Sequence, residues 1–482
     1  MFWRSIYGEL QMKIIGREKE QAALKQYYDS GLPEFLAIYG RRRIGKTFLV
    51  REFFNGKFDF YATGLANGKK EEQLHAWNIA IKQCFGGDDV SAVNWLDAFT
   101  LLRNKLEKLG NSKRKVIFID EIPWMDTQKS GFLTALEYFW NGWSSGRTDI
   151  FLIICGSATS WVVKNILKNR GGLYNRVTRR MRLLPFTLRE TEDYLREKEI
   201  DFGRYRICEA YMIFGGVPYY YSLLGKGLSL PQNIDALCFA DDGALCGEFS
   251  ELYSTLFKNS DRYIKVISAL SLKTKGLTRE EIVCESGLSS GGGLTQILEE
   301  LELCGFIRSY PNYSMDENLC LYQLTDPFSL FHLRFIRENK SRNQRFWTSN
   351  LENPSLSAWK GYAFEQVCLS HSEQIRQALG LAVISTEISS WRSRKSAGGA
   401  QIDLLIDRKD GIINLCEIKY SKAEYIISSK EEVLLRNRIA VFEAETGTRK
   451  AVHLTMVTTY GVAKNSHSGI VQSEVTLDQL FG

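Results

Sequence analysis

The chain has 482 residues, of which 44% are hydrophobic, and its formal net charge is +6. This length predicts about three domains, and the mild positive charge permits nucleic-acid binding without arguing for it. The ten cysteines include no C-x-x-C pair and the five histidines are dispersed, which argues against a disulfide framework or a zinc site and indicates a reducing compartment. No apolar run reaches the length of a membrane span and the first residues lack a signal pattern, so we expect a cytoplasmic protein with no membrane partner. Organised sequence begins at Lys13, and residues 1–11 are expected to be an upstream extension.

The first motif is a glycine-rich loop between an apolar run and a helical stretch. The run 35–39 predicts a buried strand, residues 48–54 can be helical, and the loop between them fits G-x-x-x-x-G-K-[ST]. Backbone N–H groups of such a loop and the positive end of the next helix can surround phosphates. Lys46 would reach the outer phosphates, and Thr47 would bring its hydroxyl to Mg²⁺. The predicted nucleotide-binding residues are Gly40, Arg41, Arg42, Arg43, Ile44, Gly45, Lys46, Thr47 and Phe48.

A second apolar run ends in two carboxylates. Residues 116–119 are β-formers, and Asp120 and Glu121 follow them directly. Phosphoryl transfer to water needs one carboxylate that orients Mg²⁺ and one that acts as a general base. The spacing predicts that Asp120 faces the metal, together with Thr47, and that Glu121 faces the attacking water.

Two later residues are candidates for contacts to the γ-phosphate. Ser157 follows a predicted strand over 150–154 and would act as a sensor of the phosphate or the water, with Thr159 as second choice. The alternative is that Ser157 caps the helix that begins near Ser160. Arg176 lies in a basic stretch over 164–182 and is the candidate arginine finger, in the same chain or from a neighbouring subunit. A solvated or nucleic-acid-facing patch is the other interpretation of that stretch.

Six motifs occur in one order along the chain: Gly-Arg-Glu, Gly-Arg-Arg-Arg-Ile-Gly-Lys-Thr, Asp-Glu-Ile-Pro-Trp-Met, Cys-Gly-Ser-Ala, Gly-Gly-Leu-Tyr-Asn-Arg and Gly-Gly-Val-Pro-Tyr-Tyr. In this series the chain resembles the prokaryotic archaeal-type ATPase family, a group of P-loop proteins related to STAND and AAA+ ATPases. The resemblance implies an ATP site at Lys46, Thr47, Asp120 and Glu121, a Gly-Arg-Glu box near the nucleotide base, and a role for Arg176. It also implies a C-terminal domain similar to PD-(D/E)xK nucleases. The last motif, at 215–220, breaks a helical pattern and is interpreted as a lid hinge.

The middle of the chain predicts three short helices and a hairpin, which resemble a winged helix. In DNA-binding winged helices the third helix enters the major groove. Here that helix, over 294–304, carries Glu299, Glu300 and Glu302, which would repel phosphate. A packing or interaction module is therefore favoured over a DNA reader.

The C-terminal part carries Asp403 on one predicted strand and Glu-x-Lys, at Glu417 and Lys419, on the next. Asp403 and Glu417 could hold Mg²⁺, Lys419 could assist the water, and Glu365 from a preceding helix would complete the site. A period of two puts Glu417 and Lys419 on one face. If a four-residue loop joins the strands, Asp403 falls on the opposite face, so an active site requires a bulge or a loop of three or five residues. Gln401 stands where relatives often have Glu.

Together these features predict an α/β chain: a P-loop NTPase with a parallel, AAA+-like sheet, a helical lid, a winged-helix-like domain and a restriction-endonuclease-like α/β domain. The expected boundaries are 1–210, 211–257, 258–335 and 336–482. The expected cofactors are ATP and Mg²⁺. The main functional hypothesis is an ATPase whose nucleotide state regulates a nuclease-like domain that acts on or binds DNA. The alternative is a STAND-type signalling or assembly ATPase whose nuclease-like domain only binds. DNA and a second copy of the chain are candidate partners.

Overall fold

The computed structural model describes residues 13–87, 91–111, 113–168, 171–173, 175–273, 276–311, 313, 320–393 and 400–482. The chain divides into two units, one up to Pro185 and one from Phe186 onward. The sequence placed its first boundary at residue 210, and the four predicted domains remain predictions. None of the helices in the described part is long and apolar enough to cross a membrane.

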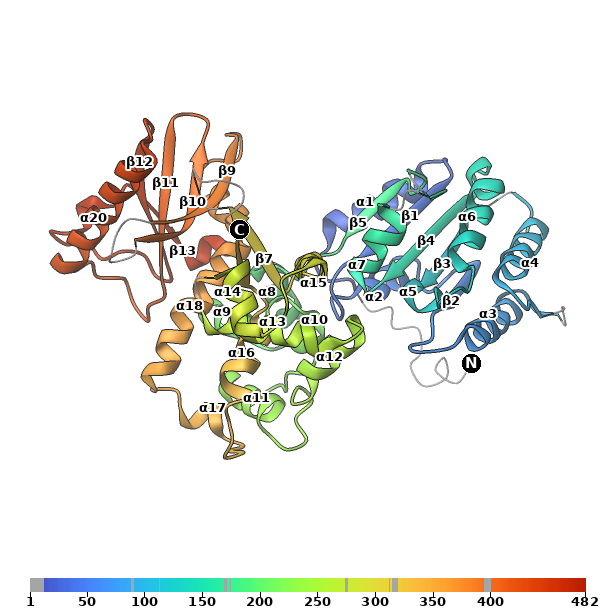
Figure 1. Ribbon diagram of the computed structural model, residues 1–482, viewed down its shortest axis with the longest axis horizontal. Coiled ribbons are helices and arrows are strands. Elements are labelled where there is room, and N and C mark those ends of the chain that lie inside the picture. Colours follow the sequence, from blue (N-terminus) through green and yellow to red (C-terminus); the bar gives the residue numbers. More distant parts are fainter. Residues whose placement is uncertain are drawn as a thin grey trace. The chain divides into compact units, whose positions relative to one another are not determined.

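The first unit is built on a parallel sheet with strand order β2-β3-β4-β1-β5 (Figure 1). Its strands are β1 (Glu34–Tyr39), β2 (Phe60–Thr63), β3 (Lys115–Asp120), β4 (Ile150–Gly156) and β5 (Arg179–Arg182). Its helices are α1 (Glu18–Asp29), α2 (Lys46–Phe53), α3 (Lys70–Phe85), α4 (Trp95–Lys108), α5 (Ile122–Met125), α6 (Phe132–Gly142) and α7 (Thr159–Val162). This arrangement confirms the predicted α/β class with a parallel sheet.

Helices cover both faces of this sheet because its strands are apolar on both sides. Leu36 and Ile38 of β1 pack with Leu24 of α1 and Leu49 of α2 on one face. On the other face aromatic rings connect the sheet to the helices: Phe60 to Trp77, Trp77 to Trp95, Trp95 to Phe132 and Phe35 to Trp140. The two hydrophobic layers hold the central strands in place, and the candidate functional side chains lie where these strands end.

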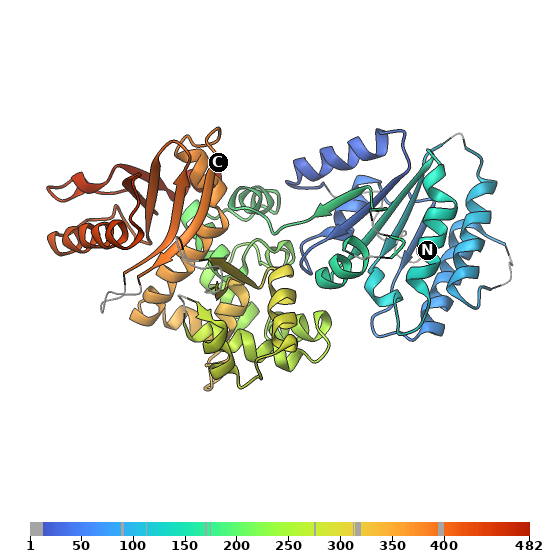
Figure 2. The same ribbon diagram turned by 45° about the horizontal axis from the view of Figure 1, so that its top comes forward.

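The second unit begins with helices and continues into two small sheets (Figure 2). Its helices are α8 (Leu188–Glu197), α9 (Arg204–Phe214), α10 (Pro218–Ser222), α11 (Leu230–Cys238), α12 (Glu248–Leu256), α13 (Ser260–Leu272), α14 (Arg279–Ser286), α15 (Gly292–Leu303), α16 (Pro327–Phe331), α17 (Phe346–Ser349), α18 (Pro354–Ser370), α19 (Ser372–Ala378) and α20 (Ser429–Thr446). Strands β6 (Leu277–Thr278), β8 (Cys320–Leu324) and β7 (Ile307–Pro311) form a small antiparallel sheet.

The last sheet has the order β13-β12-β11-β10-β9. Its strands are β9 (Thr386–Arg392), β10 (Gln401–Arg408), β11 (Ile412–Lys419), β12 (Ala451–Thr458) and β13 (Ser473–Thr476). Strands β9, β10 and β11 are antiparallel neighbours, and β11, β12 and β13 run parallel. Leu415 and Leu454 pack with Leu435 and Phe442 of α20 on one face, and Cys416 and Ile418 belong to the core on the other.

The glycine pair interpreted as a hinge marks a close backbone approach. A Cβ on Gly216 would lie 1.9 Å from the carbonyl oxygen of Phe186. The amide of Phe186 donates to the carbonyl of Gly216 at 2.6 Å. Gly215 ends α9 with φ +58°, a conformation that glycine adopts without strain. This close contact fixes the path of the chain after α9. It explains why two glycines stand here without invoking hinge motion.

The acidic helix of the expected winged helix is α15, and most of its charge is engaged inside the unit. Glu300 is buried and accepts a hydrogen bond from the Tyr263 hydroxyl at 2.6 Å. Glu302 accepts from the backbone amide of Ser309 at 2.8 Å. Glu299 is exposed. Hydrogen bonds from these neutral donors leave the negative charge of α15 in place, so the electrostatic argument against DNA binding is unchanged and the winged-helix assignment remains a prediction.

Candidate nucleotide site and the C-terminal carboxylates

The glycine-rich loop connects β1 to α2, as its sequence predicts. Gly40 has φ +146°, and a Cβ there would lie 2.2 Å from the carbonyl oxygen of Leu183. Gly45 has φ +88° and directly precedes α2. Both positions therefore require glycine. The Lys46 ammonium is buried within the loop, where it donates to the carbonyls of Gly40 at 2.9 Å and Arg41 at 2.8 Å.

Thr47, in the first turn of α2, and Asp120, at the end of β3, lie in contact. The Thr47 hydroxyl donates to Asp120 Oδ2 at 2.8 Å, and the Glu121 amide donates to Oδ1 at 2.9 Å. Asp120 is only 3% exposed, and burial raises the pKa of its carboxyl group. A hydroxyl and a buried carboxylate at this spacing fit Mg²⁺, whose ligands are oxygen atoms. A cation here would also favour the ionised carboxylate.

Glu121 and Ser157 also lie together. Glu121 has φ +46° in the turn after β3, and Ser157 follows β4, the neighbouring strand. The Ser157 amide donates to Glu121 Oε2 at 3.2 Å, and the Ser157 hydroxyl donates to Oε1. The residue before α7 is Ala158, which caps the helix with no side-chain bond, so the helix-cap interpretation of Ser157 is wrong. Thr159, the second choice, is buried, and its hydroxyl has no hydrogen-bond partner among the described residues.

Two arginines of the predicted site differ in their surroundings. Arg17, in the Gly-Arg-Glu box, is buried and donates from Nη2 to the carbonyl of Ile44 at 3.4 Å. It therefore supports the glycine-rich loop directly. Arg176 is exposed on the segment before β5. That segment is attached to α6, because Asn141 Nδ2 donates to the Gly172 carbonyl at 2.9 Å. Tyr174 and Arg170 lie outside the described residues, and the finger role of Arg176 remains a prediction.

The register of the C-terminal hairpin is the one that an active site requires. Asp407 pairs with Ile413, so five residues separate the paired positions, and Leu404 pairs with Cys416. Continuing this register by one residue sets Asp403 opposite Glu417 on one face. On the other side of β10 the register shifts between Ile402 and Leu405, a bulge that includes Asp403 and Leu404. Both the five-residue loop and the bulge were among the alternatives open from the sequence.

The carboxylates of this region do not converge on one metal-sized point. Among the described residues, no group of three or more His, Cys, Asp or Glu side chains lies close enough to hold a metal ion. Glu417 pairs with Lys419 at 2.8 Å and also binds the Arg438 guanidinium. Burial lowers the pKa of Lys419, but the Glu417 carboxylate raises it, and the net shift is upward. Asp403 accepts a hydrogen bond from the Gln401 amide at 2.7 Å.

Two cations near these carboxylates were missed from the sequence. Arg438 on α20 binds Glu417, and it follows Leu435 by three residues and precedes Phe442 by four, both of which face the sheet. That helical spacing could have identified it. The second is Arg308 on β7. Burial lowers the pKa of its guanidinium, and the charges of Asp403 and Glu365 oppose that shift. No sequence pattern connects β7 to these carboxylates.

The comparisons with known proteins agree with the geometry of the first unit. Residues 14–224 match the family model described as an ATPase domain predominantly from Archaea. This match and the loop geometry together define a P-loop ATPase domain in this part of the chain.

Over a longer stretch, the chain is similar to an uncharacterized protein of Methanocaldococcus jannaschii. The two are 25% identical over 398 residues, which is 81% of this chain and 84% of the other. Among solved structures, the Walker-type ATPase of Pyrococcus abyssi is 20% identical with a TM-score of 0.48, covering 67% of this chain and 96% of that one. The ORC2 protein of Aeropyrum pernix is 14% identical with a TM-score of 0.43, covering 68% and 96%.

Proposed function

We propose that this chain is a Mg²⁺-dependent ATPase in which Lys46, Thr47, Asp120, Glu121 and Ser157 form the reaction site. The observation that carries the proposal is a pair of contacts, Thr47 at the start of α2 with Asp120 at the end of β3, and Ser157 after β4 with Glu121 after β3. These contacts support the proposal of a metal-binding pair and a base at the same edge of the parallel sheet, beside a loop suited to phosphates.

Each residue has a distinct task in this proposal. Lys46 exchanges its bonds to the loop carbonyls for bonds to the outer phosphate oxygens. Thr47 and Asp120 would hold Mg²⁺, which would supply positive charge next to the phosphates. Glu121 accepts a proton from a water whose oxygen forms a bond to the γ-phosphorus, while the bond from that phosphorus to the bridging oxygen of ADP breaks. Ser157 keeps the Glu121 carboxylate oriented through its amide and hydroxyl.

For the second unit we propose that the nucleotide state regulates a nuclease-like domain that acts on or binds DNA. The hairpin register supports this, because Asp403 and Glu417 fall opposite each other. The second candidate is a signalling or assembly ATPase in which this domain only binds. It is favoured by the two cations, Lys419 and Arg438, that neutralise Glu417.

One set of variants separates these functions. ATP hydrolysis and metal-dependent DNA cleavage are measured for the unchanged chain, Lys46→Ala and Asp403→Ala, with and without ATP. Asp410→Ala is the matched control, since Asp410 lies in the turn of the same hairpin and pairs with Arg408. Cleavage lost in Asp403→Ala and kept in Asp410→Ala supports a nuclease. Cleavage that survives Asp403→Ala refutes the nuclease assignment, and no cleavage by the unchanged chain favours the binding-only function.

A further inference from the structure

We propose that the second unit contains a separate binding site for a phosphorylated nucleoside, at the start of α9. The site is an open pocket of about 350 Å³, a volume within the range of small-molecule sites. Its lining residues are Tyr205, Arg206, Glu209, Leu351, Glu352, Lys360, Lys422 and Tyr460. None of them belongs to the glycine-rich loop, so this proposal does not depend on the ATPase mechanism.

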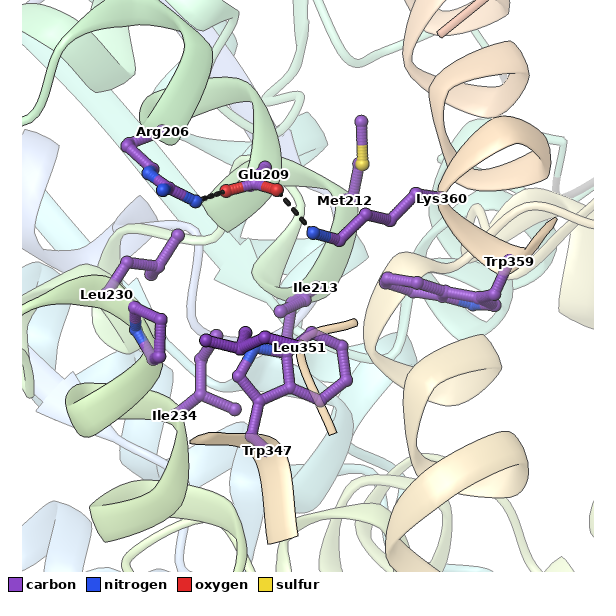
Figure 3. Close-up of a pocket in the computed structure, with 11 residues that line it drawn as sticks. Arg206, Glu209, Met212, Ile213, Leu230, Ile234, Trp347, Leu351, Trp359 and Lys360 are labelled. Atoms are coloured by element: carbon purple, nitrogen blue, oxygen red, sulfur yellow. Dashed lines mark hydrogen bonds and ion pairs between the residues drawn. The ribbon is translucent and has the colours of Figure 1, made fainter. Parts of the chain in front are cut away.

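A buried carboxylate organises the charged side of the pocket. The Glu209 side chain is only 7% exposed and binds Lys360 Nζ at 2.6 Å, the Tyr420 hydroxyl at 3.0 Å and the Arg206 guanidinium. Figure 3 shows Glu209 between Arg206 and Lys360, with both cations directed toward it. Its two oxygens are thus satisfied by donors from α9, α18 and the end of β11. Glu209 fixes the cations in place rather than offering an acceptor to a ligand.

The cations retain donors for an anion. An ammonium group has three donors and a guanidinium has five, whereas Glu209 uses one from Lys360 and one from Arg206. Lys422 adds a third cation at the rim, 3.7 Å from Glu352, and the side chains of that pair are 71% and 89% exposed. The pocket is therefore lined by three cations and two carboxylates, and each carboxylate is already paired with at least one of the cations. A phosphate group fits the remaining donors.

An aromatic stack forms the other side. The Tyr205 ring stacks with Tyr420 at 5.4 Å and with Tyr460 at 5.6 Å, with interplanar angles of 23° and 20°. Tyr460 is 46% exposed, so one end of the stack is open to solvent. A planar heterocycle can continue such a stack, because every nucleobase has a π-face. Cations next to a stacking surface are the combination that binds a nucleobase and its phosphate together.

A second, smaller cavity lies next to this pocket and shares Arg206, Glu209, Leu351 and Lys360 with it. The other residues that line the smaller cavity are apolar and buried for the most part, among them Met212, Ile213, Leu230, Ile234, Trp347 and Trp359 (Figure 3). Apolar walls with a few placed polar groups are typical of small-molecule sites. The nucleoside phosphate can come from a free mononucleotide or from the end of a single-stranded nucleic acid, and the experiment distinguishes the two.

The test uses the full chain with Lys46→Ala, which weakens binding at the glycine-rich loop. Binding of AMP, adenosine, inorganic phosphate and a 5′-phosphorylated oligothymidylate is measured by equilibrium dialysis. The measurement is repeated after adding Tyr460→Ala, Lys422→Glu or the control Lys430→Glu, which changes an exposed lysine on α20. Tyr460 and Lys422 are exposed, so neither variant should disturb folding, and thermal unfolding verifies this.

We expect AMP or the oligonucleotide to bind more tightly than adenosine or phosphate alone. Tyr460→Ala and Lys422→Glu should each weaken that binding by about tenfold, and Lys430→Glu by less than about twofold. Binding of AMP alone identifies a free nucleotide as the ligand, and binding of the oligonucleotide alone identifies a strand end. No binding at millimolar concentrations, or equal loss in Lys430→Glu, overturns the proposal.

Discussion

The most direct test of the hydrolytic site is Glu121→Gln. In the unchanged chain Ser157 donates to both carboxylate oxygens of Glu121. The glutamine side chain keeps the shape and one of these oxygens, so its carbonyl can still accept a hydrogen bond from Ser157. It cannot accept a proton from water. A general base contributes about 10²- to 10⁴-fold to a rate, which corresponds to about 3–5 kcal/mol of activation free energy. Because one of the two contacts to Ser157 survives, the cost to folding should be about 1 kcal/mol or less.

The assay is phosphate release at saturating ATP, with ATP affinity measured separately by calorimetry. We expect kcat to fall at least about a hundredfold while the Kd for ATP changes less than about threefold. Glu107→Gln is the matched control, since Glu107 lies on the surface of α4 and pairs with Arg103 at 3.0 Å. If Glu121→Gln retains more than about a tenth of the wild-type kcat, the assignment of Glu121 as general base is wrong.

Three further predictions concern binding and stability. Lys46→Ala should weaken ATP binding about 10- to 100-fold by calorimetry, because charge-assisted bonds to phosphate are lost; a change below about threefold would contradict the role of Lys46. Asp149→Ala removes the partner of Lys115, whose side chain is 2% exposed. Because a buried charge is left unpaired, the free energy of unfolding measured in urea should fall by about 3–5 kcal/mol, and a fall below about 1 kcal/mol would refute this. Burial lowers the pKa of His371 to about 4, and its Nε2 accepts from the Leu188 amide at 3.0 Å. The unfolded chain therefore binds more protons, so stability is complete above the ordinary histidine pKa of about 6.5 and falls by up to about 3 kcal/mol as the pH drops toward 4. Urea titrations across this range should show a smaller loss for His371→Gln, and an equal loss would exclude His371 as the cause.

The phosphate-binding features could be predicted because they depend on short stretches of sequence. Gly40 and Gly45 mark the loop, and Asp120 and Glu121 follow an apolar run directly. Strand ends in a parallel sheet lie at one edge, which explains why Ser157 could be anticipated as well. The sequence could not show that the Ser157 hydroxyl contacts Glu121. That contact depends on the strand order, because β3 and β4 are neighbours only in the folded sheet.

The C-terminal site could be predicted only in part. The sequence proposed Asp403 and Glu417 as site residues, which stays a prediction, but could not choose the loop length, and one residue decides whether the two share a face. The sequence also did not predict the cations that surround these two carboxylates. Arg438 lies on a helix after the hairpin and Arg308 on a strand before it, so the position of each cation depends on tertiary packing. An electrostatic environment made by several distant elements has no local sequence pattern.

Internal partners of the reactive groups explain how the first unit can respond to a nucleotide. Lys46 is bonded to loop carbonyls, Thr47 to Asp120, and Glu121 to Ser157. In the proposed mechanism a phosphate and its metal would compete with each of these bonds, so binding would change three contacts at the ends of three adjacent strands. A ligand shifts an equilibrium only by its difference in affinity for the two states, and such exchanged bonds supply that difference. The same reasoning applies to Glu417, whose bonds to Lys419 and Arg438 must be exchanged before it can bind a metal. Nucleotide dependence of DNA cleavage would therefore have to act through those two cations, and cleavage unaffected by Arg438→Ala would contradict this coupling.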